Sequence, residues 1–171
     1  MKTIVLKFGG TSVGSISRIK RIAQIISNYK RKKNRVVVIS SAMSGVTNDL
    51  VKKSKLISNN FNKAEYDVLV STGEQVSCAL IAARLDHLGF KSRSWMSWQI
   101  PIITGGPYSS SRIEKIPTRD IEKYIKSGGI PIITGFQGLN NYLRLTTLGR
   151  GGSDASAIMI AKFFKADKCI I

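Results

Sequence analysis

The sequence is poor in several residue types, and each scarcity excludes a class of protein or site. Its 171 residues include one histidine and two cysteines, Cys78 and Cys169, which stand far apart without metal-ligand spacing. A zinc site and a disulfide framework are therefore not predicted, and we expect a reduced, cytoplasmic protein. No apolar run reaches the roughly 18 residues of a membrane span. The N-terminus also lacks the apolar core and cleavage site of a secretory signal, so we expect no membrane partner.

Acidic residues are also scarce. The chain has 27 Lys+Arg against 10 Asp+Glu, a formal net charge of +17, and its first acidic residue is Asp49. The run YKRKKNR at 29–35 is densely basic. Such a balance favours polyanionic partners such as nucleotides, nucleic acid or acidic metabolites. A lysine-rich solvated surface, or a piece of a larger protein whose acidic part is missing, would give the same numbers.

The apolar residues alternate between strand and helix patterns, which predicts the α/β class with a mainly parallel sheet flanked by helices on both faces. The segment TIVLKF is followed by a helical spacing of isoleucines and then by RVVVIS, a βαβ unit. We expect strands at 3–8, 35–40, 92–98, 130–136 and 168–171, helices at 18–29, 47–57, 75–88, 118–127 and 153–165, and a hairpin at 137–149. The final KCII reads as the start of a buried strand, so we expect the chain to be cut short.

The first strand ends in LKFGGTSVG, a glycine-rich turn preceded by a lysine. The sequence has neither G-x-x-x-x-G-K-[ST] nor G-x-G-x-x-G. In an open α/β sheet, ligands bind beyond the carboxyl ends of the strands, where Lys7 is expected. Gly9 and Gly10 allow close backbone approach, and the following helix start favours an anion. The alternative is a lysine that snorkels from the strand edge beside glycines that serve only the turn.

Four further motifs fall at element junctions on the same side of the predicted sheet. They combine small and hydroxyl residues with Glu, Arg and Asp, which a purely structural set of loops does not usually gather. The motifs are SSAMSGVTNDL at 40–50, STGEQVSCAL at 71–80, TGFQG at 134–138 and TTLGRGGSDASA at 146–157.

With these motifs in this order, the sequence resembles the kinase domain of aspartate kinases, members of the amino-acid kinase superfamily. The resemblance extends from residue 3 to the end. It implies transfer of the γ-phosphoryl group of ATP to the side-chain carboxylate of L-aspartate, the first step toward lysine, threonine and methionine. Catalysis of this kind depends on positioning and electrostatic stabilisation. Mg²⁺ is inferred from the chemistry of ATP, and no protein ligands for it are identified.

The resemblance also implies roles for individual residues. Lys7 matches the catalytic lysine and Asp154 the aspartate that orients it. Arg150 matches the arginine for the substrate carboxylate, and Glu74 the acid for the substrate ammonium. The remaining matches are Gly9, Gly10 and Ser12 for phosphate, and Ser41, Thr47, Phe136 and Ser153 for the acceptor.

Several of these residues also have simpler interpretations. Glu74 and Asp154 could be acids favoured in a first helical turn. Ser153 could be an N-cap, and Phe136 a core aromatic.

The resemblance further implies that residues 1–171 are the N-terminal, substrate-binding part of an amino-acid kinase domain. Most of the nucleotide half and the regulatory ACT domains are missing. We therefore expect activity and stability to depend on a homo-oligomer or on a chain that supplies the missing half. Three alternatives remain: an amino-acid kinase with another carboxylate acceptor, an inactive truncated remnant, and a basic nucleic-acid-binding module. The last lacks any known binding signature, so a nucleic acid partner is not expected.

Overall fold

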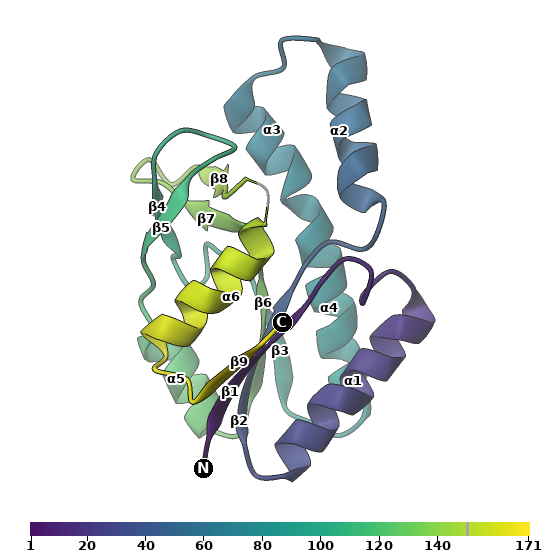
Figure 1. Cartoon of the computed structure of the whole chain (residues 1–171), viewed down its shortest axis with the longest axis vertical. Coiled ribbons are helices and arrows are strands. Elements are labelled where there is room, and N and C mark those ends of the chain that lie inside the picture. Colours follow the sequence, from purple (N-terminus) through teal and green to yellow (C-terminus); the bar gives the residue numbers. More distant parts are fainter. Residues whose placement is uncertain (150) are drawn as a thin grey trace.

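The computed structural model describes residues 1–149 and 151–171, and its centre is a parallel sheet of five strands (Figure 1). In spatial order the strands are β3 (Ser92–Trp95), β6 (Ile130–Thr134), β2 (Arg35–Ser40), β1 (Thr3–Phe8) and β9 (Lys168–Ile170). Each neighbouring pair is parallel. The inner strands are almost continuously apolar because both faces of the sheet are covered, as in β2, where only Arg35 is not fully buried. The predicted fold class is confirmed.

Helices cover both faces of this sheet (Figure 1). The helices α1 (Ile16–Arg31) and α4 (Thr72–His87) pack on one face, and α5 (Arg119–Lys126) and α6 (Gly152–Phe163) on the other. Successive strand residues point to opposite faces. Leu6 therefore belongs to the core under α1 and α4, whereas Val5 belongs to the core under α5 and α6. Lys7 follows Val5 by two positions, so its side chain starts on the face of α6.

A second, smaller sheet lies beside the first. Its spatial order is β5 (Arg112–Lys115), β4 (Ile103–Gly105), β7 (Gln137–Leu139) and β8 (Leu145–Thr147). The antiparallel pair β7–β8 is the hairpin expected at 137–149. No element was expected where β4 and β5 lie, because these strands are only three and four residues long and their register shifts between Ile103 and Thr104.

The helix α2 (Val46–Ile57) is followed by α3 (Lys63–Val70), which the sequence pattern did not predict. The Asn62 side chain caps α3 by accepting hydrogen bonds from the Ala64 and Glu65 amides, so the Asn-x-x-Glu spacing was its available signal. Together α3 and α4 form a 25-residue helix, Lys63–His87. By length and composition this helix could cross a membrane, but half of its most apolar window is buried within the protein, as in a core helix.

The expectation of a buried strand at 168–171 is wrong in part. The strand β9 exists and pairs with β1, but Lys168 and Cys169 are exposed. The reason is its position at the edge of the sheet, where only β1 adjoins it.

Candidate functional site

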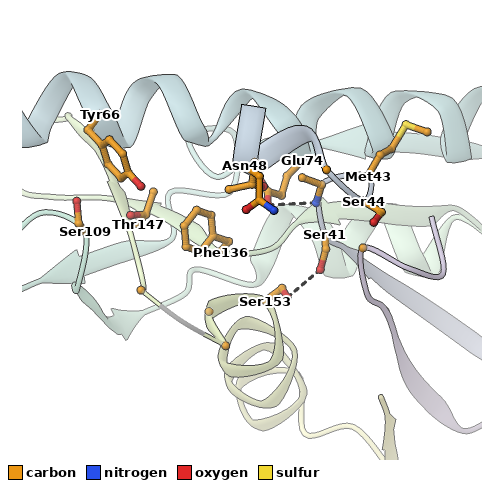
Figure 2. Close-up of a pocket in the computed structure, with 17 residues that line it drawn as sticks. Ser41, Met43, Ser44, Asn48, Tyr66, Glu74, Ser109, Phe136, Thr147 and Ser153 are labelled. Carbon is orange, nitrogen blue, oxygen red and sulfur yellow. Dashed lines mark hydrogen bonds between the residues drawn. The ribbon is translucent and has the colours of Figure 1, made fainter. Parts of the chain in front are cut away.

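A cavity of about 510 Å³ lies where the carboxyl ends of the parallel strands meet the start of α6 (Figure 2). Its walls come from the loops after β1, β2 and β6, from the first turns of α2 and α6, from α3 and α4, and from the small sheet. The lining residues are Gly10, Ser41, Ala42, Met43, Ser44, Gly45, Thr47, Asn48, Tyr66, Glu74, Ser109, Phe136, Thr147, Gly149, Gly151, Gly152 and Ser153. Six of the residues singled out from the sequence are therefore together here: Gly10, Ser41, Thr47, Glu74, Phe136 and Ser153.

Beside the cavity, Lys7 forms an ion pair with Asp154. The lysine comes from the end of β1 and the aspartate from the first turn of α6. The Lys7 side chain is only 10% exposed, whereas that of Asp154 is 47% exposed. A Cβ atom at Gly9 would lie 3.4 Å from the Lys7 Nζ, so this glycine leaves room next to the ammonium. The pair thus holds one positive charge at the sheet edge in a fixed place.

Glu74 provides a buried carboxyl group in the cavity wall. It lies in the first turn of α4, its exposure is 3%, and its Oε1 accepts a hydrogen bond of 3.1 Å from the Ala42 amide. Among the residues that the structure describes, none donates to its buried Oε2. Burial raises the pKa of Glu74 to about 7, although the Ala42 amide works in the opposite direction. The free oxygen is therefore ready to accept a donor from a ligand.

Close packing of small residues brings Glu74 to that amide. A Cβ at Gly73 would lie 2.7 Å from the Ala42 Cβ, a distance that real structures essentially never show. Glycine at position 73 therefore allows α4 to approach the loop after β2. The glycine preceding the acid in STGE is required by this contact.

Hydroxyl groups connect the loop after β2 to α6. The Ser41 Oγ donates a hydrogen bond of 2.8 Å to the Ser153 Oγ, as Figure 2 shows. The N-cap of α6 is Gly151, with φ of 71°, so the alternative interpretation of Ser153 as the N-cap is wrong. Asp154 does lie in the first turn of α6, where a carboxylate suits the helix dipole.

Phe136 lies in the turn between β6 and β7 and has a φ of 68°, which is unusual for a bulky residue. Its amide donates to the Ser156 Oγ at 2.9 Å, which ties the turn to α6. A Cβ at Gly152 would lie 2.7 Å from the Phe136 Cδ2. The aromatic ring thus packs directly on the backbone at the start of α6 and closes one side of the cavity.

Among the predicted site residues that the structure describes, four do not line this cavity: Lys7, Gly9, Ser12 and Asp154. Ser12 lines a separate depression of about 260 Å³ between the β1 turn and α1, with Phe8 and Arg18. Arg150 lies outside the described residues.

Other residues of the cavity wall were not singled out from the sequence. Met43, Ser44 and Asn48 belong to the recognised motif at 40–50, so that motif was a usable signal. Tyr66 and Ser109 lie in segments for which no element was predicted. Thr147 belongs to the motif at 146–157. Behind this wall, Asp67 is fully buried and bonded to both Ser109 and Thr147, and sequence reasoning missed it completely.

The described residues, 1–149 and 151–171, contain no group of three or more His, Cys, Asp or Glu side chains that could hold a metal ion. The described part of the site offers a lysine ammonium, a buried carboxyl, hydroxyls and backbone amides. These groups can bind a small zwitterion next to an anion.

Comparison with known proteins gives full-length matches to this chain. The Amino acid kinase family matches residues 2–171. An aspartokinase from Rickettsia conorii is 49% identical over 174 residues, which cover 100% of this chain and 43% of the relative. An aspartokinase from Geobacillus stearothermophilus is 47% identical over 171 residues, covering 100% of this chain and 42% of the relative. The chain spans less than half the length of these relatives.

A solved structure agrees with the sequence matches. Aspartate kinase from Synechocystis superposes with a TM-score of 0.83 at 40% identity, over 97% of this chain and 27% of that protein. The family match covers the parallel sheet, the lysine-glycine turn at its edge and the start of α6 alike. By sequence and by fold, this chain belongs to the amino acid kinase family.

Proposed function

We propose that this chain is the acceptor-binding part of an aspartate kinase. In the reaction, a side-chain carboxylate oxygen of L-aspartate attacks the γ-phosphorus of ATP, the bond to the β-phosphate oxygen breaks, and 4-phospho-L-aspartate and ADP form. No covalent enzyme intermediate is needed. The proposal is supported by similarity, over the whole of this chain, to part of proteins named aspartokinase.

The free oxygen of Glu74 is the observation that carries the proposal. A buried carboxyl with one unused oxygen in a cavity is costly unless a ligand supplies a donor. The ammonium group of an α-amino acid supplies a charged donor and converts Glu74 into its stabilised carboxylate form. An acceptor without an ammonium group would leave this oxygen unpaired, so the site favours an amino acid.

Lys7 serves the phosphate side of the proposed reaction. Phosphoryl transfer between two anions is limited by charge repulsion and by the alignment of the reacting groups. A fixed ammonium at the transferring group reduces the repulsion and helps to align these groups. Asp154 holds that ammonium in place, and Gly9 leaves space beside it. Gly10 stays a prediction for phosphate, and in the structure its backbone lies close to the Ala42 carbonyl. Ser12 stays a prediction for phosphate. Arg150 stays a prediction for the second carboxylate of aspartate and lies outside the described residues.

ATP and Mg²⁺ fit this arrangement only if the ion comes with the nucleotide. Because the described residues offer no cluster of metal ligands, Mg²⁺ would reach the site bound to the phosphates, as is usual for this ion. Its chemistry there is to neutralise phosphate charge. No part of the proposal requires a metal ion held by this chain.

We further propose that residues 1–171 are the N-terminal part of the kinase domain, and that an oligomer or another chain completes the nucleotide side. The protein would act in the cytoplasm, in the first step toward lysine, threonine and methionine. A different carboxylate acceptor remains the alternative, and a panel of amino acids distinguishes the two.

Calorimetric titration with L-aspartate tests the acceptor site without requiring turnover. We expect binding that is lost with N-acetyl-L-aspartate, which lacks the ammonium, and weakened in Glu74→Gln. Equal binding of both ligands would contradict the role of Glu74.

Turnover is tested by ADP release from MgATP, with and without L-aspartate, while hydroxylamine traps the acyl phosphate. Lys7→Ala is the control. Aspartate-dependent turnover that disappears in the variant supports a complete phosphoryl-transfer site. Binding without turnover is expected if another segment must complete the nucleotide side.

A further inference from the structure

Asp67 is a fully buried carboxylate on α3 that accepts four hydrogen bonds. Its Oδ2 accepts from the backbone amides of Ser109 and Thr147, and its Oδ1 accepts from their two hydroxyls, at 2.8–2.9 Å. An ionised carboxylate is an acceptor-only group, so four donors match it completely. Such a group needs no ligand of its own.

The two residues held by Asp67 both line the cavity. Ser109 lies in the turn between β4 and β5, and Thr147 ends β8. Figure 2 shows them together with Tyr66, the neighbour of Asp67, in one part of the wall. Ser109 has a φ of 65°, a conformation that costs a non-glycine residue free energy and persists only where its surroundings fix it. Asp67 supplies that fixation to the Ser109 backbone directly.

The same helix carries Glu74. Asp67 and Glu74 lie seven positions apart on the helix Lys63–His87, about 20° from alignment and about 10 Å along its axis. Both carboxyls therefore face the same side of the helix. A second buried link, from the Gln137 Nε2 to the Ser71 carbonyl at 2.9 Å, joins the small sheet to the helix between them.

We propose that Asp67 is a positioning residue of the acceptor pocket: it fixes the wall made by Ser109 and Thr147 relative to the helix that presents Glu74. This inference rests on the proposed function of the cavity as an amino acid site. Thr147 is also three residues before Arg150 in the sequence, so the segment that Asp67 anchors leads to the residue predicted to bind the acceptor's carboxylate. Asp67 itself does not line the cavity.

Two variants separate the hydrogen bonds from the charge. In Asp67→Ala, the amides of Ser109 and Thr147 lose their acceptor and become unpaired donors, which destabilises the position of the wall. In Asp67→Asn, the remaining oxygen can still accept from both amides, while the new NH₂ group faces two hydroxyls. Hydroxyls can turn and accept, so asparagine should preserve the position of the wall.

The experiment measures L-aspartate affinity by calorimetry and amide hydrogen exchange in the same proteins. We expect the Kd of Asp67→Ala to rise about tenfold or more, and that of Asp67→Asn to stay within about threefold of the unaltered chain. Exchange in Asp67→Ala should accelerate at 107–111 and 145–149, while β1 and β2 stay protected. Should the alanine variant not fold, Asp67→Ser, which keeps one acceptor, takes its place with the same expectations.

Thr104→Val is the matched control. Thr104 and Thr146 share a buried hydrogen bond of 2.5 Å in the same small sheet, and neither lines the cavity. This variant should lower the melting temperature without changing the Kd for aspartate. An Asp67→Ala protein that binds aspartate within twofold of the unaltered chain would overturn the proposal.

Failure of the unaltered chain to bind aspartate would reject the proposed function instead. In that case the hydrogen-exchange experiment still tests whether Asp67 positions the wall. Acceleration confined to the two wall segments supports its positioning role, and unchanged or uniformly faster exchange overturns it.

Discussion

Asp67 and Glu74 face the same side of one helix, and both are buried, but Asp67 accepts four hydrogen bonds from other residues and Glu74 accepts one. The first carboxylate is fully satisfied by the protein. The second has an oxygen without a donor among the described residues. One helix thus presents a structural carboxylate and a carboxyl that is available to a ligand.

Glu74 should make the stability of the ligand-free chain depend on pH. Its pKa is about 7 in the folded state against 4.5 for an ordinary glutamate. Between these values the folded state binds more protons, so the free energy of unfolding should fall as pH rises from about 4.5 to about 7. Over this pH range the free energy of unfolding should fall by about 3 kcal/mol in total. In urea unfolding, Glu74→Gln should remove this dependence and be the more stable protein at pH 8. Glu114→Gln, at an exposed position, is the control and should retain the slope.

Aspartate binding should release protons from the same residue. At pH 7 about half of the Glu74 side chains are protonated, and an ammonium beside the carboxyl favours its charged form. We expect the release of about half a proton per site. Calorimetry in buffers of different ionisation enthalpy measures this number. A value that Glu74→Gln leaves unchanged would assign the proton to another group.

Replacing Lys7 should affect phosphoryl transfer far more than folding. In Lys7→Met, the stem is kept and the charge is lost, so trapped acyl phosphate should fall about 10²-fold or more. The Asp154 side chain is 47% exposed as a whole, but its Oδ1, which pairs with Lys7, is buried, so the unfolding free energy should fall by about 1 kcal/mol. Lys7→Arg keeps the positive charge but places it on a planar guanidinium group, so this variant should retain only part of the activity of the unaltered chain. Full activity in Lys7→Met would remove this residue from the reaction.

The contact between Gly73 and Ala42 should behave as a coupled pair. Gly73→Ala places a methyl group 2.7 Å from the Ala42 Cβ, and such overpacking costs about 1–3 kcal/mol. Adding Ala42→Gly removes the facing methyl and should restore more than half of the loss. Urea unfolding of the four proteins gives the coupling energy. Additive effects would show that the two positions do not interact.

The parallel sheet could be predicted from the sequence because its signals are local. The β-branched run at 35–40 and the isoleucine spacing of α1 need only the residues next to them. The small sheet gives a weaker signal: the turn residues predicted its hairpin β7–β8, but nothing in the sequence indicated β4 and β5. Its strands are short, and part of its interior is a threonine pair joined by a hydrogen bond, so hydrophobic alternation is absent.

The candidate site likewise has one part that local sequence signals predicted and one part that they did not. Motifs at strand ends predicted that Ser41, Glu74 and Phe136 would lie together, because parallel strands end at one edge. The role of Asp67 could not be predicted, because its donors come from the turn after β4 and from β8, far along the chain. An aspartate in a helix is usually solvated, and only the tertiary structure reveals four donors around it.

The pairing of β1 has a consequence for the order in which the molecule can assemble. Ile4 and Leu6 pair with β2 on one side and with residues 168 and 170 of β9 on the other. During synthesis, β1 and β2 can associate early, but one edge of β1 stays open until the most distant segment arrives. Lys7 likewise meets Asp154 only after α6 has been made. The charge pair beside the cavity therefore joins segments almost 150 positions apart, and a nascent chain cannot present a correctly held lysine to phosphate before α6 has been synthesised.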